Sequence, residues 1–210
     1  MKTKSSSGIF DFIQKFYPEY VGDQEYPVSE SVFFQKKTDD HWILSNMSAC
    51  LLMVNGVPFK SSEHLFQTMK FATKESIQAV YHSNSPKMTA KHYQKLGGHR
   101  REDWGAMIID AMKYCLQLKY EQCPEFREEL ERTKGKFIVE LQDRKADKEQ
   151  SRPNGWGVKT KGDMYIGPNI MGRLLMELRN NGKLKYILNN EVWQLKLLFP
   201  KFVPLICEYW

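Results

Sequence analysis

Apolar and polar residues follow two periods along the chain, and the change of period predicts the order of its elements. Short apolar runs, SVFFQ from Ser31 and ACLLMVNGVPF from Ala49, are typical of strands. The second run contains Asn55-Gly56, a strong hairpin signal. Helical spacing then begins near Ser62, and a further strand is expected at GKFIVEL, residues 135–141.

Five segments have helical spacing and recognisable ends. Ser61 or Ser62 can cap the first, Gly97-Gly98 ends the second, and Pro124 ends the third. The predicted helices cover residues 62–74, 87–96, 103–122, 124–133 and 170–181. Residues 141–169 are expected to form a long loop, and a loop of that length inside a compact domain is usually functional or disordered.

These elements predict an α+β fold, a mainly helical single domain with a small β-sheet. Changes in composition divide the chain into an N-terminal arm at residues 1–30, the domain at 31–182, and an apolar C-terminal extension at 183–210. A length of 210 residues fits one domain. We expect the extension to pack on the domain, and the pattern leaves the oligomeric state open.

Charge and composition narrow the function classes. The net charge is +6 with 41% hydrophobic and 27% charged residues, which indicates a globular protein whose partner is anionic, such as a nucleotide or nucleic acid. No apolar run reaches membrane-spanning length, so no membrane contact is expected. The four cysteines form no CxxC pair, which predicts reduced thiols and an intracellular, cytoplasmic or nuclear location. The histidines show no ligand spacing, so neither a metal nor another cofactor is predicted.

The stretch SSEHLFQTMKF places an acid, an amide and an amine on one line of the first helix. At about 100° per residue, Gln67 lies about 40° from Glu63 and Lys70 about 20° to the other side. Phe66 and Phe71 border the stripe. Such a stripe is either a solvated helix face or the wall of a pocket in which two side chains converge on a ligand.

Three other features can bind a ligand. Trp104, at the start of a helix, is either a core indole or a stacking platform, whereas Trp156 lies between glycines on a loop, where ligand stacking is favoured. GPNIMG, residues 167–172, leads from a loop into a helix, a geometry that can offer N–H groups to phosphate. It lacks the full Walker or Rossmann spacing.

The order of these motifs resembles the NADAR family, also called YbiA-like, whose name records a link to NAD and ADP-ribose. The resemblance covers about residues 31–182. The motifs that carry it are FF at 33–34, LSN at 44–46, SEHLFQTMKF, RREDW at 100–104, LKY at 118–120, FIVEL before Asp143, WG at 156–157, GPNIMG and LLMELR at 174–179.

The resemblance implies hydrolysis of an N-glycosidic bond. It implies removal of ADP-ribose from guanine bases in nucleic acid, or cleavage of phosphoribosylamino intermediates of riboflavin biosynthesis. A non-catalytic ADP-ribose-binding module is the further alternative. The basic charge favours the nucleic-acid substrate.

The resemblance also implies site residues. Glu63, Lys70 and Asp143 would be catalytic, and the two carboxyl groups could divide the roles of proton donor and stabilising carboxylate. Desolvation between Phe66 and Phe71 would favour the neutral amine of Lys70, so we hypothesise that this amine forms a Schiff base with the opened sugar; direct attack by water is the alternative. The substrate-binding residues would be Phe34, Asn46, Gln67, Arg101, Trp104, Trp156, Gly167, Asn169 and Gly172.

The chain departs from the family pattern at three points. Pro168 replaces a lysine that could contact phosphate, which shifts that role to backbone N–H groups and Arg101. Met47 replaces the usual aromatic residue after LSN. The stretch before WG is longer, so Asp147 is an alternative to Asp143.

Overall fold

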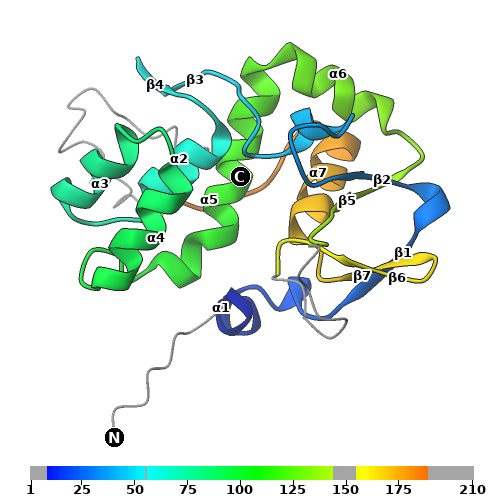
Figure 1. Cartoon of the computed structure of the whole chain (residues 1–210), viewed down its shortest axis with the longest axis horizontal. Coiled ribbons are helices and arrows are strands. Elements are labelled where there is room, and N and C mark those ends of the chain that lie inside the picture. Colours follow the sequence, from blue (N-terminus) through cyan, green and yellow to red (C-terminus); the bar gives the residue numbers. More distant parts are fainter. Residues whose placement is uncertain (1–8, 55, 144–154, 189–210) are drawn as a thin grey trace, which may run out of the picture. The chain divides into compact units, whose positions relative to one another are not determined.

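The structure is a computed structural model that describes residues 9–54, 56–143 and 155–188 (Figure 1). The described chain has an α+β fold, which confirms the predicted class. It divides into two compact units. The first unit comprises Met1–Ser45 and Leu130–Gly182, and the second comprises Asn46–Glu129 and Lys183–Trp210. Residues 31–182, predicted as one domain, therefore contribute to both units.

The second unit is mainly helical and begins with a hairpin. Strands β3 and β4 pair antiparallel around Gly56, whose φ of +81° suits glycine. The elements are β3 (Leu52–Val54), β4 (Val57–Phe59), α2 (Ser62–Met69), α3 (Lys74–Tyr81), α4 (Pro86–Leu96), α5 (Trp104–Gln122) and α6 (Pro124–Arg132), which continues into the first unit.

Helix α5 forms the centre of the second unit. Most of the circumference of this helix is buried, instead of a single face, because both α2 and β3 pack on it. Met107, Ile109, Cys115 and Leu116 are among its buried side chains. The predicted boundaries of this helix, 103–122, agree with the structure to one residue.

Helix α2 ends earlier than predicted. It stops at Met69 instead of continuing to Lys74, because Phe71 leaves the helix to form a β-bridge with Arg100. Thr73 then caps a separate helix, α3, which the sequence pattern did not distinguish from α2. Lys70, directly after the helix, keeps helical dihedral angles. The predicted alignment of Glu63, Gln67 and Lys70 along one side of the helix is therefore preserved.

The first unit contains two small sheets. One has the order β1-β7-β6 and is antiparallel, and in the other β2 and β5 are parallel. Its elements are α1 (Ile9–Phe16), β1 (Gln24–Pro27), β2 (Ser31–Phe34), β5 (Phe137–Glu140), β6 (Lys159–Lys161), β7 (Met164–Gly167), α7 (Ile170–Asn181) and 3₁₀ helices at Pro18–Tyr20, Val28–Glu30 and Trp42–Leu44. Tyr26, Val139, Val158 and Tyr165 form a buried cluster.

The predicted loop at residues 141–169 contains a hairpin, so that prediction is wrong for its second half. β6 and β7 are joined by Gly162-Asp163, a two-residue turn sequence that favours hairpins. The strand was missed because Lys159–Lys161 has no apolar residue to reveal its period. Residues 144–154, including Asp147, lie outside the described residues.

Both predicted terminal segments contain ordered structure. Within residues 1–30, β1 pairs with β7, with Tyr26 opposite Tyr165, so this part of the arm belongs to a sheet of the first unit. Within the C-terminal extension, Leu184 is buried and its N–H donates to Gln117. Residues 189–210, including Cys207, lie outside the described residues.

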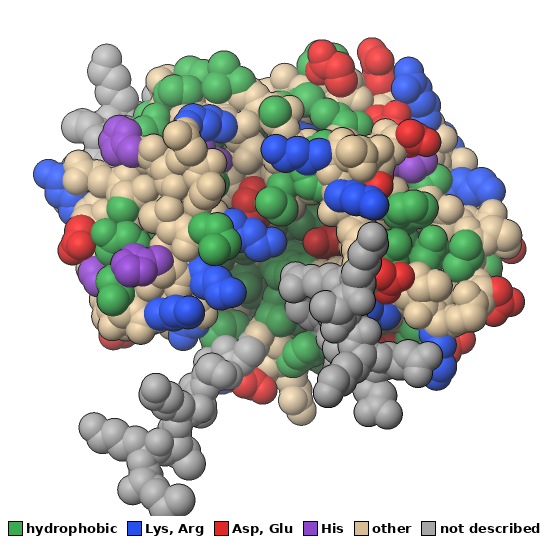
Figure 2. Space-filling model, viewed as in Figure 1, with side chains coloured by type: hydrophobic (Ala, Val, Ile, Leu, Met, Phe, Trp, Pro, Cys, Tyr) green, Lys and Arg blue, Asp and Glu red, His purple; other side chains and the backbone are tan. Residues whose placement is uncertain are grey.

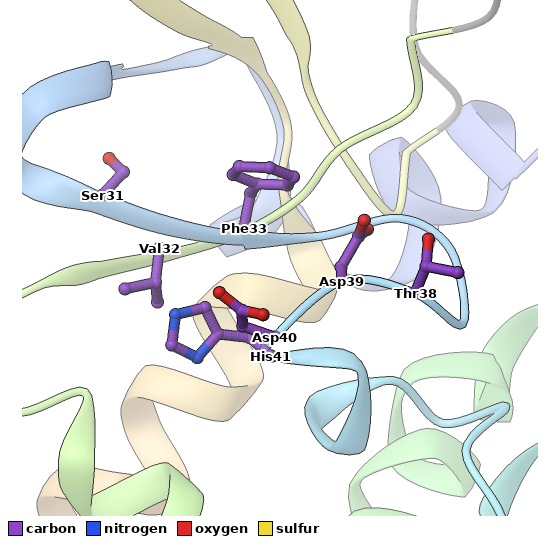
Figure 3. Close-up of a pocket in the computed structure, with 7 residues that line it drawn as sticks. All are labelled: Ser31, Val32, Phe33, Thr38, Asp39, Asp40 and His41. Atoms are coloured by element: carbon purple, nitrogen blue, oxygen red, sulfur yellow. The ribbon is translucent and has the colours of Figure 1, made fainter.

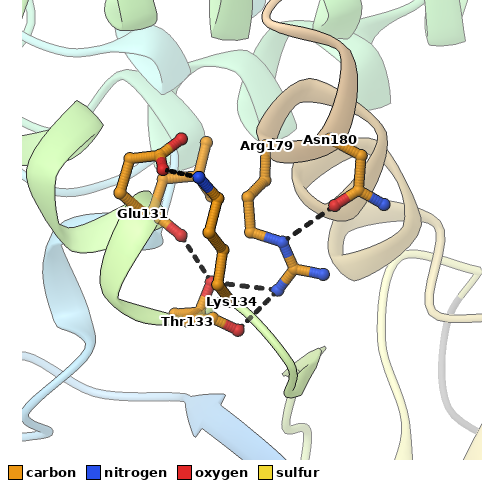
Figure 4. Close-up of polar contacts among 6 residues, drawn as sticks. Glu131, Thr133, Lys134, Arg179 and Asn180 are labelled. Carbon is orange, nitrogen blue, oxygen red and sulfur yellow. Dashed lines mark hydrogen bonds and ion pairs between the residues drawn. The ribbon is translucent and has the colours of Figure 1, made fainter.

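Near the C-terminal end of α7, the Arg179 side chain forms hydrogen bonds with the turn that precedes β5 (Figure 4). The Nη1 atom of Arg179 donates to the carbonyl oxygens of Thr133 at 2.7 Å and Lys136 at 2.8 Å. Nε donates to Asn180, and Lys134 pairs with Glu131 beside this contact. These bonds satisfy carbonyl groups in the turn before β5.

Among the described helices, none combines the length and apolar character needed to cross a membrane.

Candidate active site

The predicted catalytic helix α2 is buried over its whole length. All eight residues from Ser62 to Met69 are buried, because α3, α4 and α5 pack around the helix. Ser61 caps it by accepting the His64 N–H at 3.1 Å. Glu63 and Gln67 are therefore not part of a solvated face, and their burial needs a compensating set of hydrogen bonds, whereas Lys70 at the end of the helix is half-buried.

Glu63 receives those hydrogen bonds from two amide side chains. Asn46 Nδ2 donates to Oε2 at 2.5 Å, and Gln67 Nε2 donates to Oε1 at 3.0 Å. The Glu63 N–H also donates to the Asn46 carbonyl at 2.8 Å, which fixes the turn holding Asn46 beside the helix. Glu63 is 5% exposed. The second unit thus brings together three residues that the sequence predicted for the site.

Burial raises the pKa of the Glu63 carboxyl. Lys87, Gln67, Lys70 and Asn46 act in the opposite direction, since each stabilises the carboxylate, but desolvation is the largest influence. A buried carboxyl with a raised pKa keeps its proton to higher pH than an exposed one. This is the property of a group that can donate a proton near neutral pH.

Lys70 has a pKa lowered to about 8, chiefly by burial and also by the neighbouring Arg100, against the opposing influence of Glu63. Its Nζ donates to Gln94 Oε1 at 2.7 Å. The neutral amine is therefore available at lower pH than in an ordinary lysine. An amine in this form can act as a nucleophile toward an anomeric carbon.

Gln67 has one further feature. Its Oε1 is buried and accepts no hydrogen bond from the part of the chain that the structure describes, whereas its Nε2 donates to Glu63. A buried acceptor without a donor is uncommon in folded proteins. The orientation of this amide follows from the bond to Glu63, in which an N–H faces a carboxylate oxygen.

His64, in the same motif, has a structural role. Nδ1 accepts the Lys60 N–H at 3.1 Å, so Nε2 carries the proton and donates to the Tyr81 carbonyl at 2.8 Å. Burial lowers its pKa, and the ring also stacks on Tyr81. These contacts hold the neutral ring between β4 and α3.

Arg101 and Trp104 are buried in the second unit. Nε and Nη2 of Arg101 donate to both oxygens of Asp103, at 2.8 and 2.7 Å. Trp104 is 2% exposed and its ring lies 5.1 Å from that of Phe66. The burial of Trp104 favours the core-indole alternative. The bidentate pair commits two of the N–H groups that were expected to hold phosphate.

The remaining predicted residues belong to the first unit. Asp143 accepts from the Thr160 N–H at 3.1 Å and from its hydroxyl at 2.5 Å, so both carboxylate oxygens are engaged. Phe34 is 1% exposed, and Trp156 is half-buried. Gly167 has a φ of +155° at the end of β7.

The expectation that GPNIMG offers free N–H groups is wrong for three of its residues. The N–H groups of Asn169, Ile170 and Met171 donate to the carbonyls of residues 157, 155 and 156, at 3.2, 3.2 and 3.0 Å. The WG loop therefore occupies the start of α7, which leaves these amides unavailable to phosphate.

Asn169 and Gly172 contribute to packing in this structure. The Asn169 side chain is fully buried, donates to the Ile138 carbonyl at 2.9 Å and accepts the Glu140 N–H at 3.2 Å. Its left-handed φ of 48° is tolerated by asparagine. A Cβ on Gly172 would overlap the Ile138 carbonyl oxygen, so glycine allows α7 to approach β5 closely.

A separate pocket lies in the first unit, along residues 31–33 of β2 and the turn 38–41, with a volume of about 330 Å³ (Figure 3). Val32 and Phe33 point to opposite sides of the strand in Figure 3. Asp39 Oδ2 accepts hydrogen bonds from the N–H groups of Gln35 and Lys36, an arrangement typical of turns. None of the predicted catalytic residues lines this pocket.

The sequence analysis missed two cations that act on the buried pair. Lys87 is the strongest charged influence on Glu63, and Arg100 acts on Lys70. Arg100 stands in the RREDW motif beside Arg101, but no spacing rule relates either cation to α2. Only the folding of residues 87 and 100 back onto that helix reveals them.

The chain belongs to the NADAR domain family, because residues 32–181 match that family. The predicted resemblance is confirmed. N-glycosidase YbiA of Escherichia coli K12 is 30% identical over 146 residues, 70% of this chain and 84% of that protein. The NMR structure of E. coli YbiA gives a TM-score of 0.57 at 29% identity, over 72% of this chain and 84% of that one.

A second named relative is more distant. Riboflavin biosynthesis protein VVA0006 of Vibrio vulnificus is 26% identical over 153 residues, which are 72% of this chain and 38% of that protein.

Proposed function

We propose that the protein is an N-glycosidase that removes ADP-ribose from modified guanine bases in nucleic acid. The observation that carries the proposal is the buried carboxyl of Glu63, held by two amides, on the same short helix as a lysine of lowered pKa. Membership of the NADAR domain family and the similarity to N-glycosidase YbiA support the reaction class.

The chemistry follows from the two groups. The neutral amine of Lys70 attacks the anomeric carbon while the bond from that carbon to the leaving nitrogen breaks. Glu63 donates its proton to the leaving amine and takes one from the Lys70 nitrogen. The sugar ring opens to an imine, water adds to the imine carbon, and the bond to Lys70 breaks. The products are free sugar, free base and the original amine.

The net charge of +6 supports a nucleic-acid substrate, since cationic side chains release counterions from phosphates on binding. A specific observation favours a second candidate: one relative is named as a riboflavin biosynthesis protein. That candidate is hydrolysis of a phosphoribosylamino intermediate. Both substrates contain a ribosyl–nitrogen bond, so the same two groups would serve either one.

Asp143 keeps its predicted role as a second carboxylate, to be tested by replacement. Because Thr160 engages both oxygens, we assign it no proton transfer. If Asp143→Asn reduces kcat as strongly as Glu63→Gln, then Asp143 is catalytic; a change below about threefold would make it a structural residue.

The decisive experiment offers both substrates to wild-type protein and measures the released base or sugar. Borohydride is added during turnover, and mass spectrometry locates any adduct. We expect release, and a reduced sugar adduct on Lys70 that is absent from Lys70→Ala. Glu63→Gln should lower kcat by about 10²- to 10⁴-fold.

Two results would overturn parts of this proposal. Full activity in Lys70→Ala without an adduct would exclude the imine and leave direct attack by water. Release from neither substrate, with ADP-ribose still bound, would identify a non-catalytic ADP-ribose-binding module.

A further inference from the structure

The amine of Lys70 forms a hydrogen bond with a side chain of the neighbouring helix α4. Its Nζ donates to Gln94 Oε1 at 2.7 Å, and Gln94 lies two residues before the end of that helix. Lys70 is half-buried and Gln94 is exposed. The bond therefore lies at the boundary between the interior and the solvent, where a substrate can still reach the amine.

Main-chain bonds join the end of α4 to the residues directly after α2. The helix ends before Gly97-Gly98, whose φ values of +78° and +71° turn the chain back. The Ala72 N–H then donates to the His99 carbonyl at 2.8 Å, and the Arg101 N–H donates to the Lys70 carbonyl at 3.1 Å. The backbone on both sides of the contact is thus fixed independently of the side chains that form it.

A ring contact supports the same alignment. Tyr93, next to Gln94, has its ring 6.3 Å from that of Phe71, next to Lys70. Two consecutive residues of α4 therefore face two consecutive residues at the end of α2. This pairing holds Gln94 in register with Lys70.

The other end of α4 lies close to the acid of the same stripe. Lys87 Nζ is 3.9 Å from the sulfur of Met47, which directly follows a residue that donates to Glu63. Lys87 and Gln94 are seven residues apart, as are Glu63 and Lys70, and an interval of seven returns to about the same side of a helix. One side of α4 therefore runs along the predicted stripe of α2, on which it packs (Figure 1).

The chemistry of the Gln94 contact suits a nucleophile. A neutral amine has two N–H groups and one free electron pair, and an amide oxygen can only accept a hydrogen bond. Bonding one N–H to this oxygen fixes the nitrogen and leaves the electron pair free to attack carbon. A donor at the same place would bind the electron pair and suppress the attack.

The absence of charge on this acceptor matters as much as its position. A carboxylate in place of Gln94 would stabilise the ammonium form of Lys70, whereas an amide oxygen accepts the same bond without a net charge. Lys91 and Lys95 are exposed on α4, and Lys and Arg side chains gather over the helices of the second unit in the space-filling view (Figure 2). Such basic surroundings disfavour a further ammonium group, in agreement with the lowered pKa of Lys70.

We propose that Gln94 is a positioning residue that holds the amine of Lys70 for attack on the anomeric carbon. This inference rests on the proposed function and adds a residue to the same site. Gln94 acts only through Lys70: it accepts one N–H of the amine, keeps the electron pair turned away from the amide oxygen, and adds no charge.

The experiment compares kcat, KM and the pH–rate profile of wild type, Gln94→Met and Gln94→Glu on the substrate that wild type cleaves. Gln94→Met keeps the size of the side chain without the acceptor, so kcat should fall about tenfold while KM changes by less than about threefold. Gln94→Glu keeps the acceptor and adds a charge, so the rising limb of the profile should move up by about one pH unit.

Gln78→Glu is the matched control, because Gln78 is an exposed glutamine on α3 and the change adds the same charge to the second unit. It should keep the wild-type profile. Unfolding midpoints equal to that of wild type exclude a general loss of structure in the Gln94 variants. Wild-type kcat in Gln94→Met, or the wild-type profile in Gln94→Glu, overturns the inference.

A labelling arm separates failure of the inference from failure of the proposed function. Acetic anhydride acetylates neutral lysine amines, and mass spectrometry follows its reaction with Lys70 across a pH series. The midpoint should lie at about 8 in wild type and be higher in Gln94→Glu, but not in Gln78→Glu. If so, and if wild type cleaves neither substrate, the N-glycosidase proposal fails and the control of the amine by Gln94 stands. If wild type forms the Lys70 adduct and all midpoints are equal, the proposed function stands and the inference fails.

Discussion

At the scale of single residues, burial determines the chemistry of this site. Glu63 and Lys70 would be an ordinary acid and amine on a solvated helix, where such groups contribute little. In the structure, desolvation raises the pKa of one and lowers that of the other. The two shifts move both groups toward their uncharged forms, in which the acid can donate a proton and the amine can attack.

The pH dependence of activity follows from Lys70. Only the neutral amine attacks, so kcat/KM should stop rising with pH near the lysine pKa of about 8, and it should fall once Glu63 has lost the proton that it donates to the leaving amine. An unshifted lysine would still be gaining activity near 10.5. The measurement is a pH–rate profile on either substrate. Arg100→Ala removes one influence that lowers this pKa, so its rising limb should move to higher pH. A wild-type profile still climbing steeply above pH 9 would contradict the assignment.

At the scale of elements, close packing converts polar residues into buried ones. Lys119 on α5 is fully buried, with its Nζ 2.6 Å from Ser48 Oγ and 4.5 Å from the centre of the Phe126 ring. Helix α7 approaches β5 through Gly172. Each of these contacts joins two elements, so a substitution at either residue should change the free energy of unfolding.

Lys119 should make stability depend on pH. Burial lowers its pKa from 10.5 to about 8 in the folded protein, so between these values the unfolded chain binds the proton and the folded chain does not. The free energy of unfolding therefore rises with pH across this window. Relative to Lys119→Met, wild type should gain about 1–3 kcal/mol from pH 7.5 to 10.5, measured by urea unfolding. Lys91→Met should parallel wild type, and identical slopes in all three proteins would refute the prediction.

Gly172→Ala should destabilise the first unit by about 1–3 kcal/mol, because the added Cβ meets the Ile138 carbonyl oxygen and the Asn169 side chain. An exposed glycine inside a helix behaves oppositely, since alanine there gains about 1 kcal/mol. Thermal and urea unfolding measure the sign. Asn181→Ala, at the exposed end of α7, should change stability by less than about 0.5 kcal/mol. A stabilised Gly172→Ala protein would show that α7 does not pack so closely on β5.

At the scale of the whole molecule, charge bears on the choice of substrate. The chain has 31 Lys and Arg against 25 Asp and Glu. Much of this charge is exposed and therefore screened by salt, whereas burial shields Glu63 from salt and Lys70 is half-buried. Binding of a long polyanion should consequently respond to ionic strength more strongly than the chemical step.

The salt dependence of KM tests this point. For ADP-ribosylated DNA, KM should rise by about tenfold or more between 50 and 200 mM salt, and for a small phosphoribosylamino substrate by much less. In both cases kcat should change little. Equal salt slopes for the two substrates would remove the charge argument for nucleic acid and favour the small metabolite.

The sequence by itself determined the kinds of element, most of their boundaries and the family. Periodicity, caps and turn residues act over a few positions, so α5, α7 and the hairpin at Gly56 could be predicted to within about a residue or two. It also singled out Asn46, Glu63, Gln67 and Lys70. The hairpin at Gly162 was missed because an all-polar strand carries no hydrophobic signal.

Only the tertiary structure decided which polar groups are buried and which are already bonded. Those properties depend on contacts between residues far apart in sequence, such as Asn46 with Glu63 or Arg100 with Phe71, which no local pattern encodes. In the folded chain, Arg101 and three GPNIMG amides form hydrogen bonds within the protein, and Arg100 and Lys87 act electrostatically on Lys70 and Glu63, the two candidate catalytic residues. Desolvation is a property of the packed interior, and here it turns a common acid and amine into candidate reactants.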